Sequence, residues 1–280
     1  MKTKIIMAAV VVLALCAAWI LWHRASGTVK IRYAPGKREA PRAVAKKGEP
    51  LPQITKRFNN PKIAIVMDDF GYNMNNIEAF FAIKKPVTLS ILPNLPHSRQ
   101  IEEMARARGY ETILHLPLEP HGKGVGLEKG TINSAMSDRE VLAQLGEDLD
   151  GLPGIKGVSN HMGSKATEER PLMALIIGEL KSRNMYFFDS VTSDKSVCRS
   201  VAKEAGVRCA RRNVFLDMGK ADDPNYIKKQ VLELRRFAFK NGRAIAVCHD
   251  RKNTVKVLAE MMPLLARDGV RFVYLSELVN

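Results

Sequence analysis

The sequence Lys62-Ile-Ala-Ile-Val-Met-Asp-Asp-Phe-Gly-Tyr72 places two adjacent acids, Asp68 and Asp69, directly after an apolar run. Such a run predicts a buried strand with both acids at its C-terminal end. Parallel α/β sheets build their active sites at the carboxyl ends of their strands. One carboxylate there can hold a metal ion while its neighbour transfers a proton, because the two occupy different environments. The alternative is an Asx-type turn before Gly71.

Short β-like runs alternate with helical patterns along the rest of the chain, which predicts parallel strands joined by crossover helices. The expected strands are 62–67, 87–92, 111–116, 156–159, 185–188, 213–216, 244–248 and 271–274. A capping box of Ser137 and Glu140 predicts the start of one helix, and Thr167 is the expected N-cap of another. We therefore predict one barrel-like α/β domain over residues 61–280.

The first 60 residues have a different composition. Ile5–Trp22 is an unbroken apolar stretch, barely long enough to span a bilayer. We expect residues 1–24 to be a membrane anchor or uncleaved signal, because more apolar sequence follows the small residues that a cleavage site would need. Residues 25–60 are basic and contain four prolines, which predicts a linker. The positive-inside rule would place so basic a flank in the cytoplasm.

Charge and cysteine patterns argue against two kinds of site. The net charge of +15 resides mainly in residues 1–60, which carry +10 of it, and no nucleic-acid-binding motif accompanies it. We therefore expect no nucleic-acid partner. The four cysteines show no Cys-x-x-Cys spacing, which argues against a structural zinc cluster. Cys198 and Cys209 could pair outside the cytoplasm, but we favour buried free thiols.

Polar residues end several of the predicted strands, and a barrel would gather them on one face. They are Asp68, Asp69, His115, Asn160, His161, Asp189 and His249. A lone histidine in such a place is commonly structural, but the repetition favours a shared site. An Asp-His-His set is typical of an open site for a divalent metal, with zinc favoured here over other transition metals. With a carboxylate as base and a histidine as acid, it predicts a metal-dependent hydrolase of amides or esters.

Five segments together resemble the polysaccharide deacetylase (NodB-homology) family, and the first four of them most closely resemble its divergent, YibQ-like branch. They are Met67-Asp-Asp-Phe-Gly71, His115-Leu-Pro-Leu-Glu-Pro120, Asn160-His-Met-Gly-Ser164, Phe188-Asp-Ser190 and Val247-Cys-His249. The resemblance covers roughly residues 61–280. It implies a deformed (β/α) barrel, an extracytoplasmic location and metal-dependent removal of acetyl groups from N-acetylated sugars.

The resemblance also implies roles for individual residues. Asp68 corresponds to the general base, Asp69 and His115 to metal ligands, and His249 to the general acid. Glu119 stands where the family has its second metal histidine. Either Glu119 or His161 then completes the metal site, and we favour His161, because it also ends a strand and keeps the usual ligand set.

Two departures from the family pattern bear on catalysis. The Arg-x-Pro-x-Gly motif is replaced by Asn160-His-Met-Gly-Ser164, so the arginine that orients the base is missing, and the tryptophan after the fourth motif is absent too. Asp189 is expected to fill part of the arginine's role. Asn160 and Ser164 are candidates for binding metal or substrate, or else for satisfying loop backbone groups. We interpret Arg211, Arg212 and Asp217 as a structural ion-pair network rather than a substrate rim.

Two functions remain open on this basis. The first is a membrane-anchored, metal-dependent deacetylase that acts on an N-acetylated carbohydrate polymer or oligosaccharide in the periplasm or cell envelope. The second is a catalytically inactive carbohydrate-binding or envelope-organising protein that keeps the deacetylase fold. The departures at Glu119 and at the missing arginine motivate the second.

Overall fold

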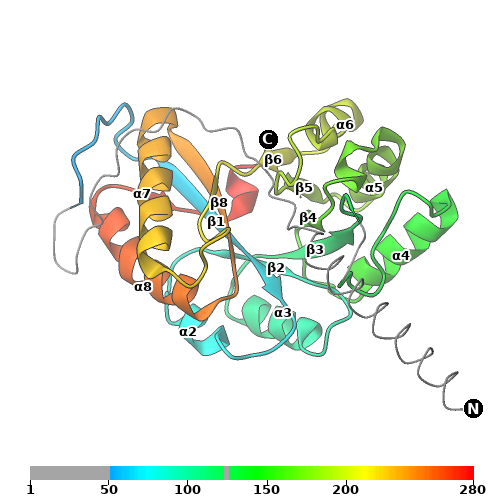
Figure 1. Cartoon of the computed structure of the whole chain (residues 1–280), viewed down its shortest axis with the longest axis horizontal. Coiled ribbons are helices and arrows are strands. Elements are labelled where there is room, and N and C mark those ends of the chain that lie inside the picture. The colour runs from blue at the N-terminus through cyan, green and yellow to red at the C-terminus, as the bar shows by residue number, and fades with distance from the viewer. Residues whose placement is uncertain (1–50, 123–125) are drawn as a thin grey trace, which may run out of the picture. The chain divides into compact units, whose positions relative to one another are not determined.

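The computed structural model describes residues 51–122 and 126–280 (Figure 1). The predicted anchor and most of the predicted linker lie outside these described residues. No helix within them combines the length and the apolar character that a bilayer crossing requires. Residues 51–60, the described end of the predicted linker, run along helix α7 (Pro224–Asn241), where Arg57 N and Phe58 N both donate to Phe239 O at 3.1 Å.

The described residues form a sheet of nine strands. These are β1 (Lys62–Phe70), β2 (Thr88–Ile91), β3 (Thr112–Leu118), β4 (Gly157–Met162), β5 (Tyr186–Asp189), β6 (Cys209–Arg211), β7 (Val214–Phe215), β8 (Arg243–His249) and β9 (Arg271–Phe272). Their order is β6-β5-β4-β3-β2-β1-β8-β7, with β9 beside the start of β1. All pairings are parallel. The predicted α/β class with parallel strands is confirmed, as a curled sheet that is open between β6 and β7.

Helices follow the strands and cover the outer face of the sheet. Besides α7 they are α2 (Ile77–Phe81), α3 (Ser98–Ala107), α4 (Asp138–Asp150), α5 (Arg170–Ser182), α6 (Cys198–Ala205) and α8 (Lys252–Arg267). The predicted capping box is confirmed, because Ser137 and Glu140 bond each other's backbone at the start of α4. The predicted cap at Thr167 is wrong. Its hydroxyl donates to Gly163 O, and α5 begins three residues later, where Pro171 fits the first helical turn.

Strand residues alternate between two hydrophobic cores. In β1, Ile63, Ile65 and Met67 belong to the core beneath the helices. Ala64 and Val66 belong to a second core on the concave face. Side chains alternate along a strand, so every second residue points to the concave face. This holds up to the C-terminal ends of the strands. In β8 that series runs through Ile245 and Val247 to His249.

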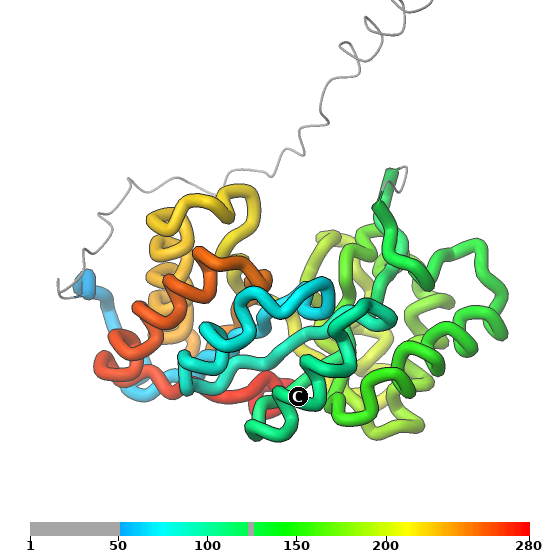
Figure 2. Tube along the Cα trace, turned by 90° about the horizontal axis from the view of Figure 1, so that it is seen from below, coloured from blue at the N-terminus to red at the C-terminus, as the bar shows by residue number. Residues whose placement is uncertain are grey.

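The C-terminal segment fills the concave face near the N-terminal ends of the strands (Figure 2). Val273, Leu275, Leu278 and Val279 pack there with residues of β1, β3, β5 and β8. Leu275 N donates to Thr88 Oγ1 at 3.0 Å, and Ser276 N donates to Glu111 Oε1 at 3.1 Å. This end of the half-barrel is therefore closed, and the opposite end holds the predicted site residues.

Candidate metal and catalytic centre

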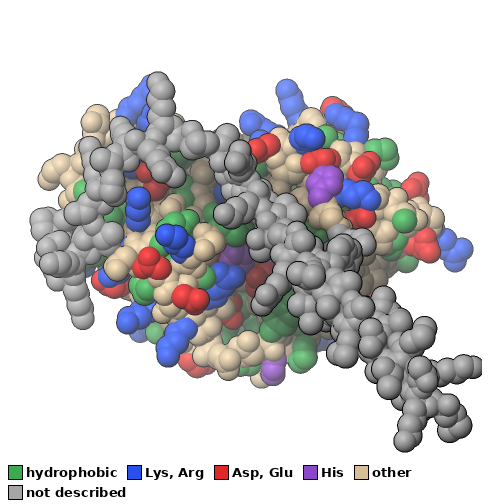
Figure 3. Space-filling model, viewed as in Figure 1, with side chains coloured by type: hydrophobic (Ala, Val, Ile, Leu, Met, Phe, Trp, Pro, Cys, Tyr) green, Lys and Arg blue, Asp and Glu red, His purple; other side chains and the backbone are tan. Residues whose placement is uncertain are grey.

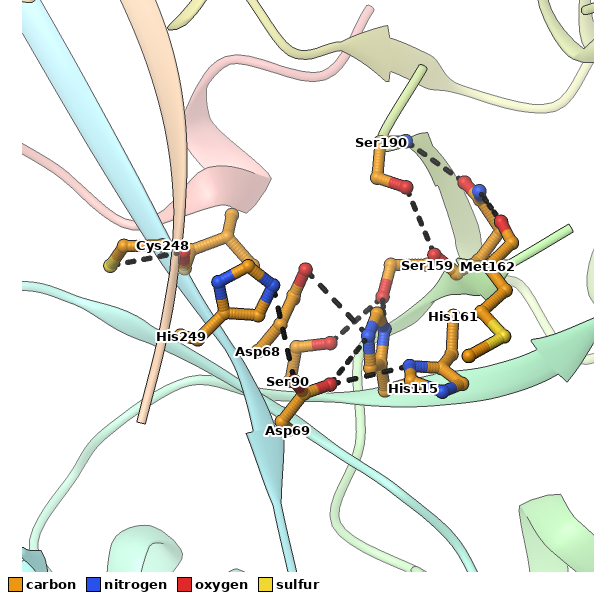
Figure 4. Close-up of polar contacts among 12 residues, drawn as sticks. Asp68, Asp69, Ser90, His115, Ser159, His161, Met162, Ser190, Cys248 and His249 are labelled. Carbon is orange, nitrogen blue, oxygen red and sulfur yellow. Dashed lines mark hydrogen bonds and ion pairs between the residues drawn. The ribbon is translucent and has the colours of Figure 1, made fainter. Parts of the chain in front are cut away.

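A bulge at the end of β1 aims both aspartates toward the concave face. Between Met67 and Phe70 the register of β1 against β2 shifts by one residue. Asp69 has a φ of 67°, in the left-handed region that non-glycine residues seldom adopt. The extra residue returns Phe70 to the outer core and leaves Asp68 and Asp69 close to the same histidines (Figure 4).

Asp69 lies between two histidines from neighbouring strands. Its Oδ1 is 3.2 Å from His161 Nδ1 and 3.4 Å from His115 Nε2. One ligand atom from each of the three residues lies within 4.8 Å of the others. The structure thus brings together Asp69, His115 and His161.

Buried hydroxyl groups orient His115. Its Nδ1 lies 2.8 Å from Ser159 Oγ, which is itself 2.8 Å from Ser90 Oγ. Ser159 can donate to Leu114 O at 3.4 Å, so its oxygen can accept a hydrogen bond from Nδ1–H. In that tautomer His115 turns an unprotonated Nε2 toward Asp69, the form that a metal ligand needs.

The donor set and its unsatisfied oxygens fit a divalent metal. Asp68 Oδ1 is buried without a hydrogen-bond partner, and Asp69 Oδ1 faces the two imidazole nitrogens without a well-aligned hydrogen bond to either. Buried carboxylate oxygens are costly in that state, because burial removes the water that would otherwise solvate them. One carboxylate and two imidazoles are ligands that suit zinc and other divalent transition metals.

The two aspartates have opposite pKa shifts. Burial raises the pKa of Asp68; His115 opposes the shift and Asp69 adds to it. Burial alone would also raise the pKa of Asp69, but His115 and His161 outweigh it and hold the pKa well below its ordinary value. Asp69 is thus kept as an anion, while Asp68 is the carboxyl that more readily takes up a proton.

His249 approaches Asp69 from the other side of the site. Its Nε2 is 3.9 Å from Asp69 Oδ2, and its Nδ1 is 2.8 Å from Asp217 Oδ1. The other Asp217 oxygen accepts hydrogen bonds from His249 N and Thr254 Oγ1. Burial lowers the pKa of His249, but Asp217 outweighs this and the net shift is upward. His249 is thereby oriented and biased toward its protonated form.

Asp217 is the functional residue that the sequence analysis missed. It was interpreted as part of an ion-pair network with Arg211 and Arg212, but its bonds go to His249 and Thr254. The signal was present, because Asp217 ends the predicted strand 213–216 in the same way that the other site residues end theirs.

Glu119 lies apart from the histidine cluster. Its Oε1 is 2.8 Å from Lys165 Nζ, and its Oε2 accepts hydrogen bonds from the backbone and hydroxyl of Ser134. Both oxygens are therefore engaged. Of the two candidates for completing the metal site, only His161 is among the residues whose ligand atoms converge.

Asn160 and Ser164 serve the loops around the site. The Asn160 amide donates to Met162 O at 2.8 Å, and its oxygen accepts from Ser190 N at 2.9 Å. Ser164 Oγ accepts from His121 N at 2.9 Å. These bonds correspond to the alternative in which both residues satisfy loop backbone groups.

Asp189 does not take the place of the missing arginine. Its oxygens bond Val191 N, Ser196 Oγ and Arg211 Nε, at 2.8, 2.9 and 3.2 Å. It therefore fixes the loop that follows β5. Across residues 51–122 and 126–280, no Arg or Lys nitrogen lies within 4.0 Å of Asp68, and the basic side chain that does is His115, whose Nε2 is 3.7 Å from Asp68 Oδ2.

The three cysteines in the described part of the chain, Cys198, Cys209 and Cys248, are free thiols.

Basic and acidic side chains are interspersed on the described part of the surface in view (Figure 3), and several form ion pairs such as Arg170–Glu204 and Arg183–Asp150.

Comparisons with known proteins identify the family. The family described as divergent polysaccharide deacetylase matches residues 65–279. An uncharacterized Escherichia coli protein, YibQ, is 35% identical over 221 residues, which cover 78% of this chain and 67% of that protein.

Two solved structures show the same fold. An uncharacterized Agrobacterium tumefaciens protein superposes with a TM-score of 0.74 at 22% identity, over 81% of this chain and 92% of its own. A structure described as T48 deacetylase with substrate has a TM-score of 0.51 at 12% identity, over 78% of this chain and 90% of its own.

Proposed function

The chain belongs to the divergent polysaccharide deacetylase family, and we propose that it is a metal-dependent hydrolase that removes acetyl groups from an N-acetylated envelope carbohydrate. One observation carries the proposal: Asp69, His115 and His161 converge around a buried, unsatisfied carboxylate oxygen, with a second acid and a third histidine beside them.

Asp69, His115 and His161 would hold the metal. A divalent metal at this position would polarise the amide carbonyl and make a water molecule more acidic. The protein contributes an oriented set of ligands. The bulge in β1 presents Asp69, and Ser159 fixes the tautomer of His115. Asn160 bonds the last residue of β4 and the first residue after β5, close to His161.

Asp68 and His249 divide the proton transfers. The pKa of Asp68 is shifted upward, toward neutral pH, and a general base is most effective when its pKa lies near the working pH. Asp68 accepts a proton from the attacking water. His249, protonated through its bond with Asp217, donates a proton to the departing amine nitrogen. His249 Nε2 lies 3.9 Å from Asp69 Oδ2, so the acid stands beside the carboxylate that would hold the metal.

Acetate release from N-acetylglucosamine oligomers by the purified full-length protein tests this proposal. We expect activity that chelation abolishes and added zinc restores. Asp68→Asn should remove most of it, while Asp194→Asn, the same change at an exposed acid outside the site, should not. Acetate release that chelation leaves unchanged would contradict the proposal.

The second candidate is a carbohydrate-binding protein that keeps the fold without turnover. It is favoured by one observation, that Asp68 has no arginine or lysine partner among the described residues. Binding of acetylated oligomers with no acetate release under any metal supplement would support it.

For either function we propose that the anchor holds the domain on the periplasmic side of the inner membrane.

A further inference from the structure

A cavity of about 350 Å³ lies away from the metal centre, at the open edge of the half-barrel. It is bounded by α6, by β6, by the start of β8 and by the end of the chain. Its charged lining comes from Arg199, Lys203, Arg211 and Arg243. None of these residues belongs to the site described above.

Most of the positive charge around this cavity is not neutralised. Arg211 pairs with Asp189 at 3.2 Å. Within the part of the chain that the structure describes, no carboxylate oxygen lies within 4.0 Å of a nitrogen of Arg199, Lys203 or Arg243. Arg170, the first residue of α5, is by contrast paired with an acid. The acid next to Lys203 on α6, Glu204, is turned away to Arg170, 2.7 Å distant.

Asn280 also lines the cavity, and its carbonyl oxygen accepts a hydrogen bond from Cys209 N at 2.9 Å. A terminal carboxylate on Asn280 would offset one of the four positive charges, and the lining would still be cationic. Cations gathered around a concave surface raise the local concentration of anions and bind oxyanions through charge-assisted hydrogen bonds.

Three apolar residues also line the cavity. Val207, Ile245 and Leu278 are buried there, each less than 10% exposed. The volume lies within the range of roughly 300–1,000 Å³ that is usual for small-molecule sites. A ligand that fits has a body of about the size of one sugar ring and carries an anionic group.

We propose that this cavity, here called the seam cavity, binds a small phosphorylated ligand of the size of a monosaccharide phosphate. A phosphate monoester is favoured over a carboxylate, because it carries more charge and offers more acceptor oxygens to the several guanidinium and ammonium groups. The seam cavity shares no residue with the metal centre, so the inference stands whether or not that centre is catalytic.

Calorimetric titration of the full-length protein with glucose 6-phosphate tests the proposal, with inorganic phosphate, glucuronate and glucose as separate arms. We expect glucose 6-phosphate to bind most tightly, phosphate more weakly, and glucose not at all. Binding should weaken as salt is added, because exposed cations are screened. Chelation of metal should leave it unchanged.

The Arg199→Glu, Lys203→Glu double variant should weaken glucose 6-phosphate binding by at least about tenfold, because it reverses two charges of the lining. The Lys229→Glu, Lys240→Glu variant makes the same charge change on α7 and should bind like the wild type. If the first variant does not fold, Arg243→Gln removes one lining charge without reversing it and should also weaken binding.

Three results would overturn the proposal. The first is no binding of glucose 6-phosphate or phosphate at millimolar concentration. The second is an equal loss in the α7 control variant, which would indicate a general effect of charge. The third is glucose or glucuronate binding as tightly as glucose 6-phosphate, which would remove the role of the phosphate group.

Discussion

Carboxylates are buried on the concave face of the sheet at both ends of the parallel strands, but their hydrogen bonding differs between the two ends. At the N-terminal end, Glu111 Oε1 accepts hydrogen bonds from Thr88 Oγ1 at 3.0 Å, from Tyr186 OH at 2.9 Å and from Ser276 N at 3.1 Å. The C-terminal segment completes this network. A buried carboxylate oxygen with three donors stabilises the fold.

At the C-terminal end, Asp68 and Asp69 each keep one buried oxygen without a partner. An unsatisfied oxygen alone does not make a site, since Asp148 on α4 also has one. What distinguishes the C-terminal end is the convergence of His115 and His161 on the same carboxylate. We therefore propose that the two ends differ in function: the hydrogen bonds of the N-terminal end stabilise the fold, and the C-terminal end receives a ligand.

The largest effect should come from Asp68→Asn. If Asp68 is the base, acetate release should fall by about 10²- to 10⁴-fold, the usual contribution of general base catalysis. The same change replaces a buried carboxylate whose pKa is raised, so the metal-free protein should unfold at a higher temperature than the wild type. Paired rate and thermal-unfolding measurements check this. A stability loss that parallels the activity loss would mean that both ends are structural.

Glu111→Ala tests the opposite end. It leaves the hydroxyls of Thr88 and Tyr186 and the Ser276 amide without their acceptor. The free energy of unfolding should fall by about 3 kcal/mol, and the rate of acetate release per folded molecule should not change. Glu111→Gln retains an acceptor oxygen and should cost less. Denaturant titration gives the values, and an unchanged midpoint for Glu111→Ala would refute the structural role of this network.

Asp217→Asn should act on turnover alone. Losing a carboxylate that orients a histidine at a metal site usually costs on the order of 10- to 100-fold in activity. We expect kcat to fall by that factor while KM and metal content stay at wild-type values, because Asp217 contacts His249 and none of the three converging ligands. Thr254→Val removes only one bond to Asp217 and should have a smaller effect. Loss of metal from Asp217→Asn would contradict this assignment.

Asp148→Asn measures how much a buried, unsatisfied carboxylate lowers the free energy of unfolding at a position away from the histidines of the candidate site. Burial raises the pKa of Asp148 to about 7, opposed by Gln144 and Asn94. A raised folded-state pKa gives stability that is full below the unfolded value and is lost as pH rises toward 7. Relative to wild type, the variant should therefore gain on the order of 3–4 kcal/mol between about pH 4 and pH 8. Unfolding curves at both pH values check it; a constant difference between the proteins would contradict it.

The strands and much of the site could be predicted from the sequence. Strands buried on both faces give nearly continuous apolar runs, so their ends stand out when a polar residue follows. His115, His161 and His249 are visible for that reason. The short strand β6 is not, since its three residues Cys209–Arg211 are only half-buried and form no apolar run.

The remainder depends on contacts that no local pattern encodes. The bulge that presents both Asp68 and Asp69 shows itself only in the register against β2. Asp189 and Asp217 both end predicted strands, and only the fold shows that the second one bonds His249 while the first one bonds its own loop. The closure of the N-terminal end depends on Ser276, which lies 165 residues from Glu111 in the sequence and donates its backbone N–H to that carboxylate.

The claim that the C-terminal end is a metal site is tested most directly by zinc binding to three proteins: the wild type, His161→Gln and Glu119→Gln. We expect the wild type and Glu119→Gln to hold about one ion per chain, and His161→Gln to bind it at least about tenfold more weakly. Full zinc retention by His161→Gln together with loss in Glu119→Gln would contradict the account.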